Sequence, residues 1–468
     1  MQKFKRKSLY LALVAAVSSL GIANTANAAV NVNGNGLGQV LIYPYYSTRA
    51  GSDTYLSVVN TTNSSKAVKV RFTEGKNSRE VLDFNLYLSP RDMWTAAVVN
   101  TNVGAKLVTT DKSCTFPKIP VTGQSFTDRA FLPTPIVEGI STAGGDGASG
   151  GMDRTREGYF EIIEMGVITN TAVIAAITHV SGLPANCSVV QTNSMDMSSG
   201  LTAVTTPSGG LAGTATLINV AGGTDFSYDP VALDSFALGN LWFPAGSILP
   251  NLEQGDPNSV VFNNGTTVNS NWGIFGVDAV SAVLMHNNII NEYVLDNTTF
   301  SGTDWVVTMP TKRYYVPVDN PATSSPSFSA TEPFTKTFWT NGACEPVGLS
   351  YWNREEGNVV SVDFSPPSPD GGAALCWEVN VLTFNRSAVL GSVNETHIDN
   401  VPFENGWLKM TFNDAGHRMI STDGDTYLGL PTVGFMVQDF VNGNVNGLLS
   451  NYGGNFSHKF TSSIVVGN

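Results

Sequence analysis

The fold class follows from Thr54–Val98, which reads TYLSVVNTTNSSKAVKVRFTEGKNSREVLDFNLYLSPRDMWTAAV. Within this stretch Val70 and Phe72 alternate with Lys69 and Arg71, which is a period of two residues. Such a period places one side of a strand on a core and the other side in water. The pattern therefore predicts a half-buried strand with its charged side chains on the wet face.

The following run repeats the alternation. Phe84 and Leu86 point to one side and Asp83 and Asn85 to the other, so Phe84 is expected in the core and Asn85 in water. Ser89-Pro90 ends the run, because proline cannot donate a hydrogen bond to a sheet. Polar clusters separate the runs at hairpin spacing. The predicted fold class is mainly β, with multi-domain antiparallel β-sandwiches and a few short helices.

The chain begins with features of an export signal. Residues 1–28 combine basic side chains, an apolar run and the small-residue ending Ala26-Asn27-Ala28. This order is typical of a secretory signal peptide, so the mature protein is expected to begin at Ala29. A membrane-spanning helix needs about 18 or more consecutive apolar residues, and we expect none after signal removal.

The charge balance is acidic. The sequence carries 25 basic and 38 acidic residues, and loss of the four basic residues of the signal leaves a net charge of −17. This charge argues against nucleic acid as a partner. Charged residues make up only 13% of the chain, so Asn, Thr, Ser and Gly carry much of its polarity. That composition favours a secreted, extracellular or cell-surface β protein over a cytoplasmic enzyme.

The four cysteines predict two disulfides in an oxidising compartment, and four cysteines allow three pairings. We favour Cys114 with Cys187 and Cys344 with Cys376, because each pair then lies inside one predicted domain. A metal site is disfavoured, since no two cysteines approach the C-x-x-C spacing and the histidines are scattered.

Composition divides the chain into five parts. They are a signal peptide at 1–28, an immunoglobulin-like sandwich at 29–110, a central β-rich domain at 111–316, a Pro- and Ser-rich linker at 317–335 and a C-terminal β-domain at 336–468.

Several local patterns resemble a known family. They are V-V-N-T at Val58–Thr61, the K-A-V-K-V-R-F strand and L-Y-L-S-P before Trp94. Together they resemble the immunoglobulin-like sandwich modules of bacterial surface and pilus-chaperone-type proteins. The resemblance covers about residues 54–98 and implies a fold rather than an activity. The rest of the chain is similar to uncharacterised secreted bacterial surface proteins.

The middle of the chain mixes strand and helix signals. Gly158–Met165 and Ala172–Thr178 are predicted strands, the second apolar enough for both faces to be covered. Short helices are predicted after Asp229-Pro230 and after Asp278, because each Asp can cap a helix start.

Few motifs point to chemistry. The GASGG sequence around Ser149 matches a nucleophile elbow but lacks the flanking strand and helix, so a surface loop is expected. Glu161 and Glu164 lie three apart on one strand and face opposite sides, which favours surface charge over an acid–base pair. Asp423-Gly424-Asp425 could bind calcium, but further ligands at EF-hand spacing are lacking and a turn is expected. No catalytic, cofactor-binding or metal-ligating residue is predicted.

The tryptophans and the histidines do not indicate a binding site. The eight tryptophans lie on separate predicted strands, which favours core packing over a carbohydrate platform. Glu355 and Glu356 beside Trp352 form a patch that could face a sugar, although solvated charge is expected. The histidines stand alone, without a ligand cluster.

The leading functional expectation is an exported structural or interaction protein of the bacterial cell surface that self-associates into a surface layer or matrix. The alternative is a carbohydrate-binding adhesin whose partners are cell-surface glycans. A secreted hydrolase is a third class, because fold alone does not exclude enzymatic function.

Overall fold

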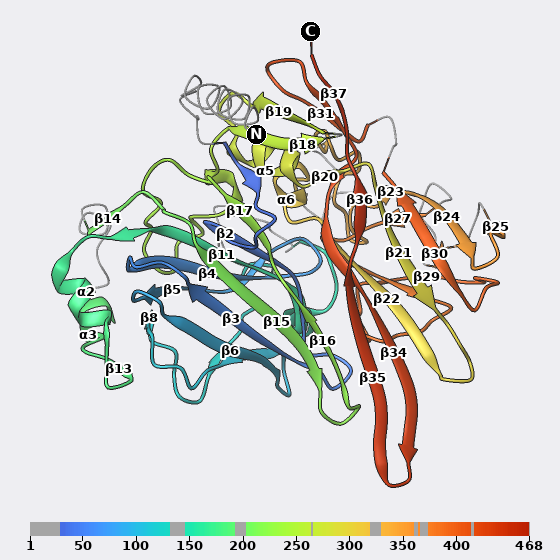
Figure 1. The fold of residues 1–468 in the computed structure, drawn as a ribbon, viewed down its shortest axis with the longest axis horizontal. Helices are drawn as coiled ribbons and strands as arrows, with labels where there is room; N and C mark the ends of the chain where they lie inside the picture. The colour runs from blue at the N-terminus through green and yellow to red at the C-terminus, as the bar shows by residue number, and fades with distance from the viewer. Residues whose placement is uncertain are drawn as a thin grey trace, which may run out of the picture.

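The computed structural model describes residues 29–131, 146–191, 203–263, 265–318, 329–359, 364–365, 373–412 and 416–467. The predicted signal peptide and residues 319–328 of the predicted linker lie outside these ranges. Strands make up 49% of the structure and helices 9%, so the prediction of a mainly-β class is confirmed. Figure 1 shows two groups of sheets side by side.

The first sandwich pairs two antiparallel sheets. Sheet 1 contains, in spatial order, β1 (Asn31–Val32), β17 (Val231–Asp234), β2 (Val40–Ser47), β11 (Glu157–Ile168), β4 (Lys66–Glu74), β5 (Glu80–Leu88) and β8 (Cys114–Phe116), and β14 (Val204–Thr205) also pairs with β11. Sheet 2 contains β16 (Thr224–Tyr228), β15 (Leu211–Asn219), β3 (Asp53–Asn60), β6 (Met93–Asn100), β7 (Ala105–Val108) and β9 (Gln124–Ser125). A shared cluster of buried apolar residues joins the two sheets.

The second sandwich also has two sheets. Sheet 3 contains β25 (Asn358–Val359), β24 (Gly348–Asn353), β30 (Asn405–Thr411), β21 (Asn288–Val294) and β36 (Lys459–Thr461). Sheet 4 contains β26 (Phe364–Ser365), β29 (Glu395–Ile398), β28 (Val379–Phe384), β22 (Ser301–Thr308), β34 (Val433–Val445) and β35 (Leu448–Ser457). The pairing of β28 with β29 is parallel, and the other pairs in these two sheets are antiparallel.

Strand pairing crosses the predicted domain boundaries at residues 110 and 316. β11 lies between β2 and β4, and β17 pairs with β2, so sheet 1 draws on sequence far beyond residue 110. β21 and β22 precede residue 316 but belong to the second sandwich. The units that the hydrogen-bonded ladders define therefore differ from the predicted division, because long-range pairing joins segments that composition separates.

Sheet 1 has both faces covered, and this corrects the prediction of a wet face. Lys69, Arg71 and Asn85 are all buried. The Lys69 ammonium pairs with Asp83 at 2.7 Å and also donates to a backbone carbonyl at Pro244. The Asn85 amide donates to another carbonyl of the same loop. A loop after β17 therefore covers the side of β4 and β5 that the alternation assigns to water.

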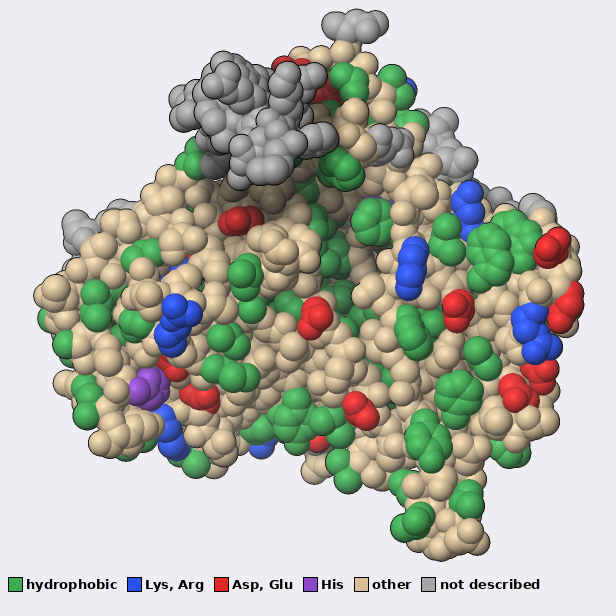
Figure 2. All heavy atoms as spheres, in the orientation of Figure 1, with side chains coloured by type: hydrophobic (Ala, Val, Ile, Leu, Met, Phe, Trp, Pro, Cys, Tyr) green, Lys and Arg blue, Asp and Glu red, His purple; other side chains and the backbone are tan. Residues whose placement is uncertain are grey.

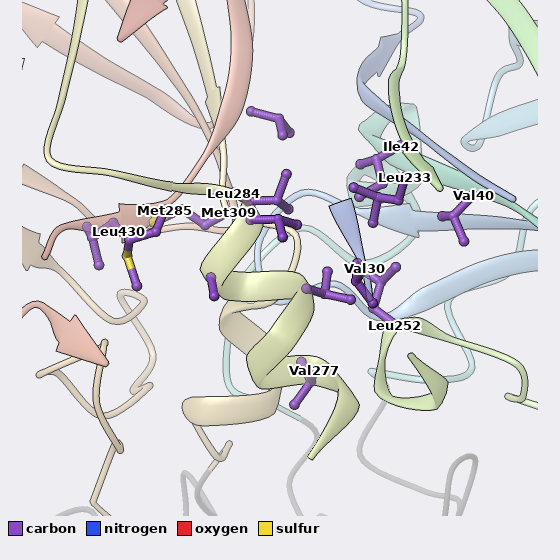
Figure 3. Packing of buried hydrophobic residues seen from close by; sticks show 14 of the residues in the cluster. Val30, Val40, Ile42, Leu233, Leu252, Val277, Leu284, Met285, Met309 and Leu430 are labelled. Atoms are coloured by element: carbon purple, nitrogen blue, oxygen red, sulfur yellow. The ribbon is translucent and has the colours of Figure 1, made fainter. Parts of the chain in front are cut away.

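Helix α5 (Gly276–Val283) lies where the two sandwiches meet, and it confirms the predicted helix. The predicted cap is wrong, because the N-cap residue is Phe275 and Asp278 lies inside the first turn. Figure 3 shows apolar side chains gathered around it from both sides. Ile42 and Leu233 come from sheet 1, whereas Met309 and Leu430 come from segments next to the second sandwich. One continuous apolar core thus joins the two sandwiches.

Two predicted elements are wrong. The segment predicted as a strand at Ala172–Thr178 is mainly helix α2 (Thr171–Ile177), because the Asn170 side chain accepts the backbone N–H groups at the helix start. The segment after Asp229-Pro230 is strand β17 rather than a helix, because it pairs with β1 on one side and β2 on the other. Tertiary pairing overrides local propensity there.

The predicted disulfides are confirmed. Cys114 bonds to Cys187 and Cys344 bonds to Cys376. The first bridge ties the edge strand β8 to the segment that carries α2 and α3 (Ser188–Gln191). None of the helices in the described part of the chain has the length and apolar character that crossing a bilayer requires.

The buried pair Lys66–Glu164 provides a test of these covered faces. Its ammonium and carboxylate lie 2.6 Å apart and both side chains are 0% exposed. We expect Lys66→Met to reduce the free energy of unfolding by about 3–5 kcal/mol, because it leaves the Glu164 charge buried without its cation. Urea unfolding measures the loss.

The control is Tyr55→Ala on the exposed side of β3, which should change stability by no more than about 0.5 kcal/mol. The double variant Lys66→Met/Glu164→Gln should recover part of the loss. Equal stability of Lys66→Met and the wild type would contradict the burial of this pair.

Candidate functional site

The residues that the sequence analysis considered for catalysis have structural partners. Ser149 lies before a 3-10 helix, Gly151–Arg156, and its backbone carbonyl accepts from the Lys76 ammonium at 2.9 Å. Glu161 and Glu164 have different cations, Arg71 and Lys66 respectively, as their opposite orientation predicts. Their assignment as surface charges is wrong, because both are buried within the covered sheet.

In the Asp423-Gly424-Asp425 turn, which was considered for calcium, both carboxylates accept hydrogen bonds from the protein. Asp425 is buried and its carboxylate accepts from the Ser270 hydroxyl at 2.6 Å and from the Gly467 N–H at 2.9 Å. Asp423 accepts from the Asn271 N–H at 2.8 Å. Across the described ranges, no group of three or more His, Cys, Asp or Glu side chains is arranged to hold a metal ion. The pair of aspartates therefore fastens loops together in this structure.

A buried polar turn connects the two sandwiches, at a position where the local pattern predicts only a hairpin connection. The Glu74 carboxylate accepts the backbone N–H groups of Lys76, Asn77 and Arg79 at 2.8, 3.0 and 3.1 Å. It also accepts from the Arg154 guanidinium at 3.0 Å. We call residues 74–79 the Glu74 turn. Its internal hydrogen bonds hold the backbone in one conformation without help from solvent.

The Glu74 turn docks on sheet 4. The carbonyl of Gly75 accepts from the Val379 N–H at 2.8 Å, and the Ser78 hydroxyl donates to Glu378 at 3.0 Å. Burial raises the pKa of Glu378 to about 8, although Lys312 nearby acts in the opposite direction. The contact between the sandwiches thus contains a carboxyl group that is stable in its protonated form.

Two histidines that are far apart in the sequence line one cavity between the sandwiches. His286 lies on β20 (Met285–His286), and His458 lies between β35 and β36. The two residues are isolated in the sequence, and the fold brings them to one cavity. Burial lowers the pKa of His286 to about 3 and that of His458 to about 4, so both imidazoles are neutral at neutral pH. No spacing in the sequence indicates this meeting, because it depends on long-range strand pairing.

The tryptophans divide into buried and surface groups. Trp94, Trp242 and Trp305 are buried, as the dispersed positions predict. Trp352 and Trp407 instead stack on each other across β24 and β30, with ring centroids 4.0 Å apart and an interplanar angle of 12°. Trp407 remains 37% exposed.

The β34–β35 hairpin forms an exposed apolar surface. Its end projects beyond the rest of the molecule in Figure 1, and hydrophobic side chains lie along the same projection in Figure 2. The exposed apolar side chains of this hairpin are Val441, Val445, Leu448, Leu449, Tyr452 and Phe456. From Val441 to Ser457 the sequence has no charged residue. This uncharged run is visible in the sequence, but only the structure shows that it is an exposed edge.

Comparison with protein-family models, curated proteins and solved structures finds no match to this chain. The resemblance to immunoglobulin-like surface modules therefore stays a prediction from local patterns. Function has to be argued from the surfaces described above.

The raised pKa of Glu378 predicts a pH dependence of stability. An unfolded glutamate has a pKa of about 4.3. Because the folded pKa lies near 8, the folded state binds the proton more tightly between these values. The stabilising contribution is complete below the unfolded pKa and is lost as pH rises through the folded pKa. Glu378→Gln should therefore flatten the fall in the free energy of unfolding between about pH 5 and pH 8.

Urea unfolding at several pH values measures this slope. Glu292→Gln, on the exposed surface of β21, is the control and should leave the slope unchanged. Burial raises the pKa of the Asp304 carboxyl to about 7. Asp304 therefore also lowers the free energy of unfolding as pH rises, and both variants keep this contribution. Parallel curves for wild type and Glu378→Gln would contradict the prediction.

Proposed function

We propose that this chain is an exported interaction protein of the bacterial cell surface that self-associates through the β34–β35 hairpin. The observation that carries the proposal is an exposed, uncharged, apolar strand at the edge of sheet 4. Export is supported by the signal-like residues 1–28, and the two disulfides are compatible with an oxidising compartment.

Edge strands of soluble proteins usually carry features that prevent pairing with another chain. Such features include lysines, prolines, bulges and covering loops. The β35 sequence contains neither lysine nor proline, and Leu448 is 73% exposed. The pairing of β34 with β35 has one irregularity, between Val441 and Asn444. The middle of β35 is covered in part by the turn between β15 and β16, since the Asn451 amide donates to the Gly222 carbonyl at 2.7 Å. The outer part therefore offers both apolar side chains and strand backbone to a second copy.

The negative net charge of the chain explains why self-association would be confined to this hairpin. The predicted mature chain has a net charge of −17, so most surfaces of two copies repel each other. An uncharged projection reduces this repulsion and adds hydrophobic burial at about 25 cal/mol per Å² of apolar surface. Contact through the two hairpins is consequently the favoured geometry for self-association.

The test is sedimentation velocity of the chain from Ala29 over a range of concentrations. We expect wild type to form larger species as concentration rises, because apolar hairpins leave water when they pair. Leu448→Lys/Tyr452→Lys should shift the distribution to the monomer at the same concentrations, since lysines on an edge strand prevent pairing.

The matched control is Val103→Lys, which adds a lysine at another exposed apolar position. It should associate as wild type does. A monomeric wild type, or equal association of the hairpin variant, would contradict the proposal. Protease treatment of intact cells tests the surface location separately, because an exposed protein is cleaved while a periplasmic one is protected.

A second candidate function, glycan binding, is supported by the Trp352–Trp407 stack on the outer face of sheet 3. Stacking covers only one face of each ring, and Trp407 is partly exposed. Glu292 pairs with Trp407 across the sheet, and Glu355 and Glu356 are exposed on the turn after β24. An aromatic face beside carboxylates provides apolar contact area together with hydrogen-bond acceptors for sugar hydroxyls.

A glycan microarray tests this candidate. If the stack is the site, Trp407→Ala should reduce the apparent affinity for the bound glycans at least about tenfold, because aromatic anchors dominate binding energy. Tyr55→Ala, which removes an exposed aromatic ring from sheet 2, should leave the signal unchanged. Binding that survives Trp407→Ala, or no bound glycan at all, would exclude the stack as a glycan site.

A further inference from the structure

A cavity of about 370 Å³ opens between the two sandwiches. Figure 2 shows hydrophobic side chains in the hollow between the two halves of the molecule. Its walls come from both sandwiches and from α5, for example Val231, Leu284, Ile289, Val307 and Phe435. Pockets for small molecules typically measure roughly 300–1,000 Å³, so this cavity has the size for a small ligand rather than for a folded partner.

The cavity also has an apolar rim. Val32, Phe262 and Phe460 are lining residues and are 44%, 74% and 56% exposed. They come from β1, β18 (Asn258–Asn263) and β36, which are far apart in the sequence. Apolar side chains that converge on a concave opening mark a site where apolar ligand surface can leave water.

The charges around the cavity select against an anionic ligand. No lysine or arginine is among its described lining residues, and Asp229 is a lining residue. His286 and His458 supply no positive charge at neutral pH, because burial keeps both imidazoles neutral. A carboxylate or phosphate in the cavity would therefore have no charged partner, and its burial would cost several kcal/mol.

The two histidines of the cavity differ in the hydrogen bonds that they already make. His458 is fully engaged, since its Nε2 donates to the Val306 carbonyl at 3.0 Å and its Nδ1 accepts from the Asn291 amide at 3.1 Å. His286 shares a hydrogen bond with the Thr432 hydroxyl through Nδ1 at 3.2 Å and stacks on Phe460. Its Nε2 has no hydrogen-bond partner in the described part of the chain.

The chemistry of this nitrogen indicates which polar group fits. Depending on the tautomer, Nε2 either donates or accepts a hydrogen bond. A hydroxyl group can do both, so an alcohol satisfies His286 in either tautomer. A hydrocarbon body fills the remaining apolar volume.

We propose that this cavity binds a neutral, hydrocarbon-rich alcohol whose hydroxyl group forms a hydrogen bond with His286 Nε2. The cavity takes lining residues such as Phe435 and Ser457 from the base of the β34–β35 hairpin, whereas the proposed self-association uses the outer part of that hairpin, so the two proposals rest on different residues.

Calorimetric titration of the chain from Ala29 tests the proposal with three probes that share one chain length. These are 1-octanol, octanoate and octylammonium at neutral pH. We expect saturable binding of one 1-octanol per chain and weaker binding of octanoate, because no described lysine or arginine lines the cavity. Octylammonium, the charge of which is complementary to the lining Asp229, tests for a cationic ligand instead. Tighter binding of octanoate or of octylammonium than of 1-octanol would overturn the neutral class of ligand.

Two variants locate the ligand. His286→Phe keeps an aromatic ring against Phe460 and should weaken 1-octanol binding roughly two- to tenfold, the effect of one hydrogen bond. Gly34→Trp should weaken it further by occupying the cavity, and a Cβ at Gly34 meets no atom within 4 Å, so the fold can accept the change.

Matched controls lie outside the cavity. His179→Phe removes an imidazole on the first sandwich, and Gly239→Trp adds the same indole at another glycine whose Cβ meets no atom within 4 Å. Both should bind 1-octanol as wild type does, and thermal melting confirms that each variant is folded. Absence of saturable binding, or binding unchanged in both His286→Phe and Gly34→Trp, would overturn the proposal. Leu448→Lys/Tyr452→Lys should retain 1-octanol binding, which separates this test from that of self-association.

Discussion

The arrangement of the two sandwiches depends on the Glu74 carboxylate. It satisfies three backbone N–H groups of its own turn and the guanidinium of Arg154. Arg154 in turn binds Asp146 through two contacts of 2.6 and 2.8 Å. Hydrogen bonds to charged groups are stronger than those between neutral groups, and these are almost completely removed from water. A turn held in this way can present its outward carbonyl and hydroxyl groups to sheet 4 in a fixed geometry.

The contact between the two sandwiches explains why the strands of sheet 1 contain buried charged residues. Sheet 1 packs against sheet 2 on one side and is covered by loops and α5 on the other, so charged residues of its strands need buried partners. Lys66, Lys69 and Arg71 each have a carboxylate partner within 3.4 Å. Buried ion pairs of this kind contribute little net stability compared with apolar packing. Their main effect is on register, because a shift of one residue would leave each charge buried without its partner.

The surfaces left uncovered by this packing are those on which function is proposed. Close packing joins the two halves near α5, whereas an apolar cavity with His286 and His458 remains between them. The β34–β35 hairpin extends past the contact with the first sandwich and keeps its apolar side chains in water. The polar network around Glu74 fixes the scaffold on which these two surfaces lie.

Local patterns predicted the mainly-β class, the Phe84 core face and the helix near Asp278, and they favoured the two observed disulfide pairs among three possible pairings. Alternation, apolar spacing and cysteine position can be read over short distances or from a few residues. The sequence also made the uncharged run of the β34–β35 hairpin visible. The burial of Asn85, Glu161 and Glu164 depends instead on tertiary contacts, since the second cover of sheet 1 comes from loops remote in the chain. The same limit applies to the site. His286 and His458 are 172 residues apart, and a local pattern cannot bring them together. Their meeting in one cavity follows from strand pairings such as β21 with β36, whose partners are joined only when the whole chain has folded.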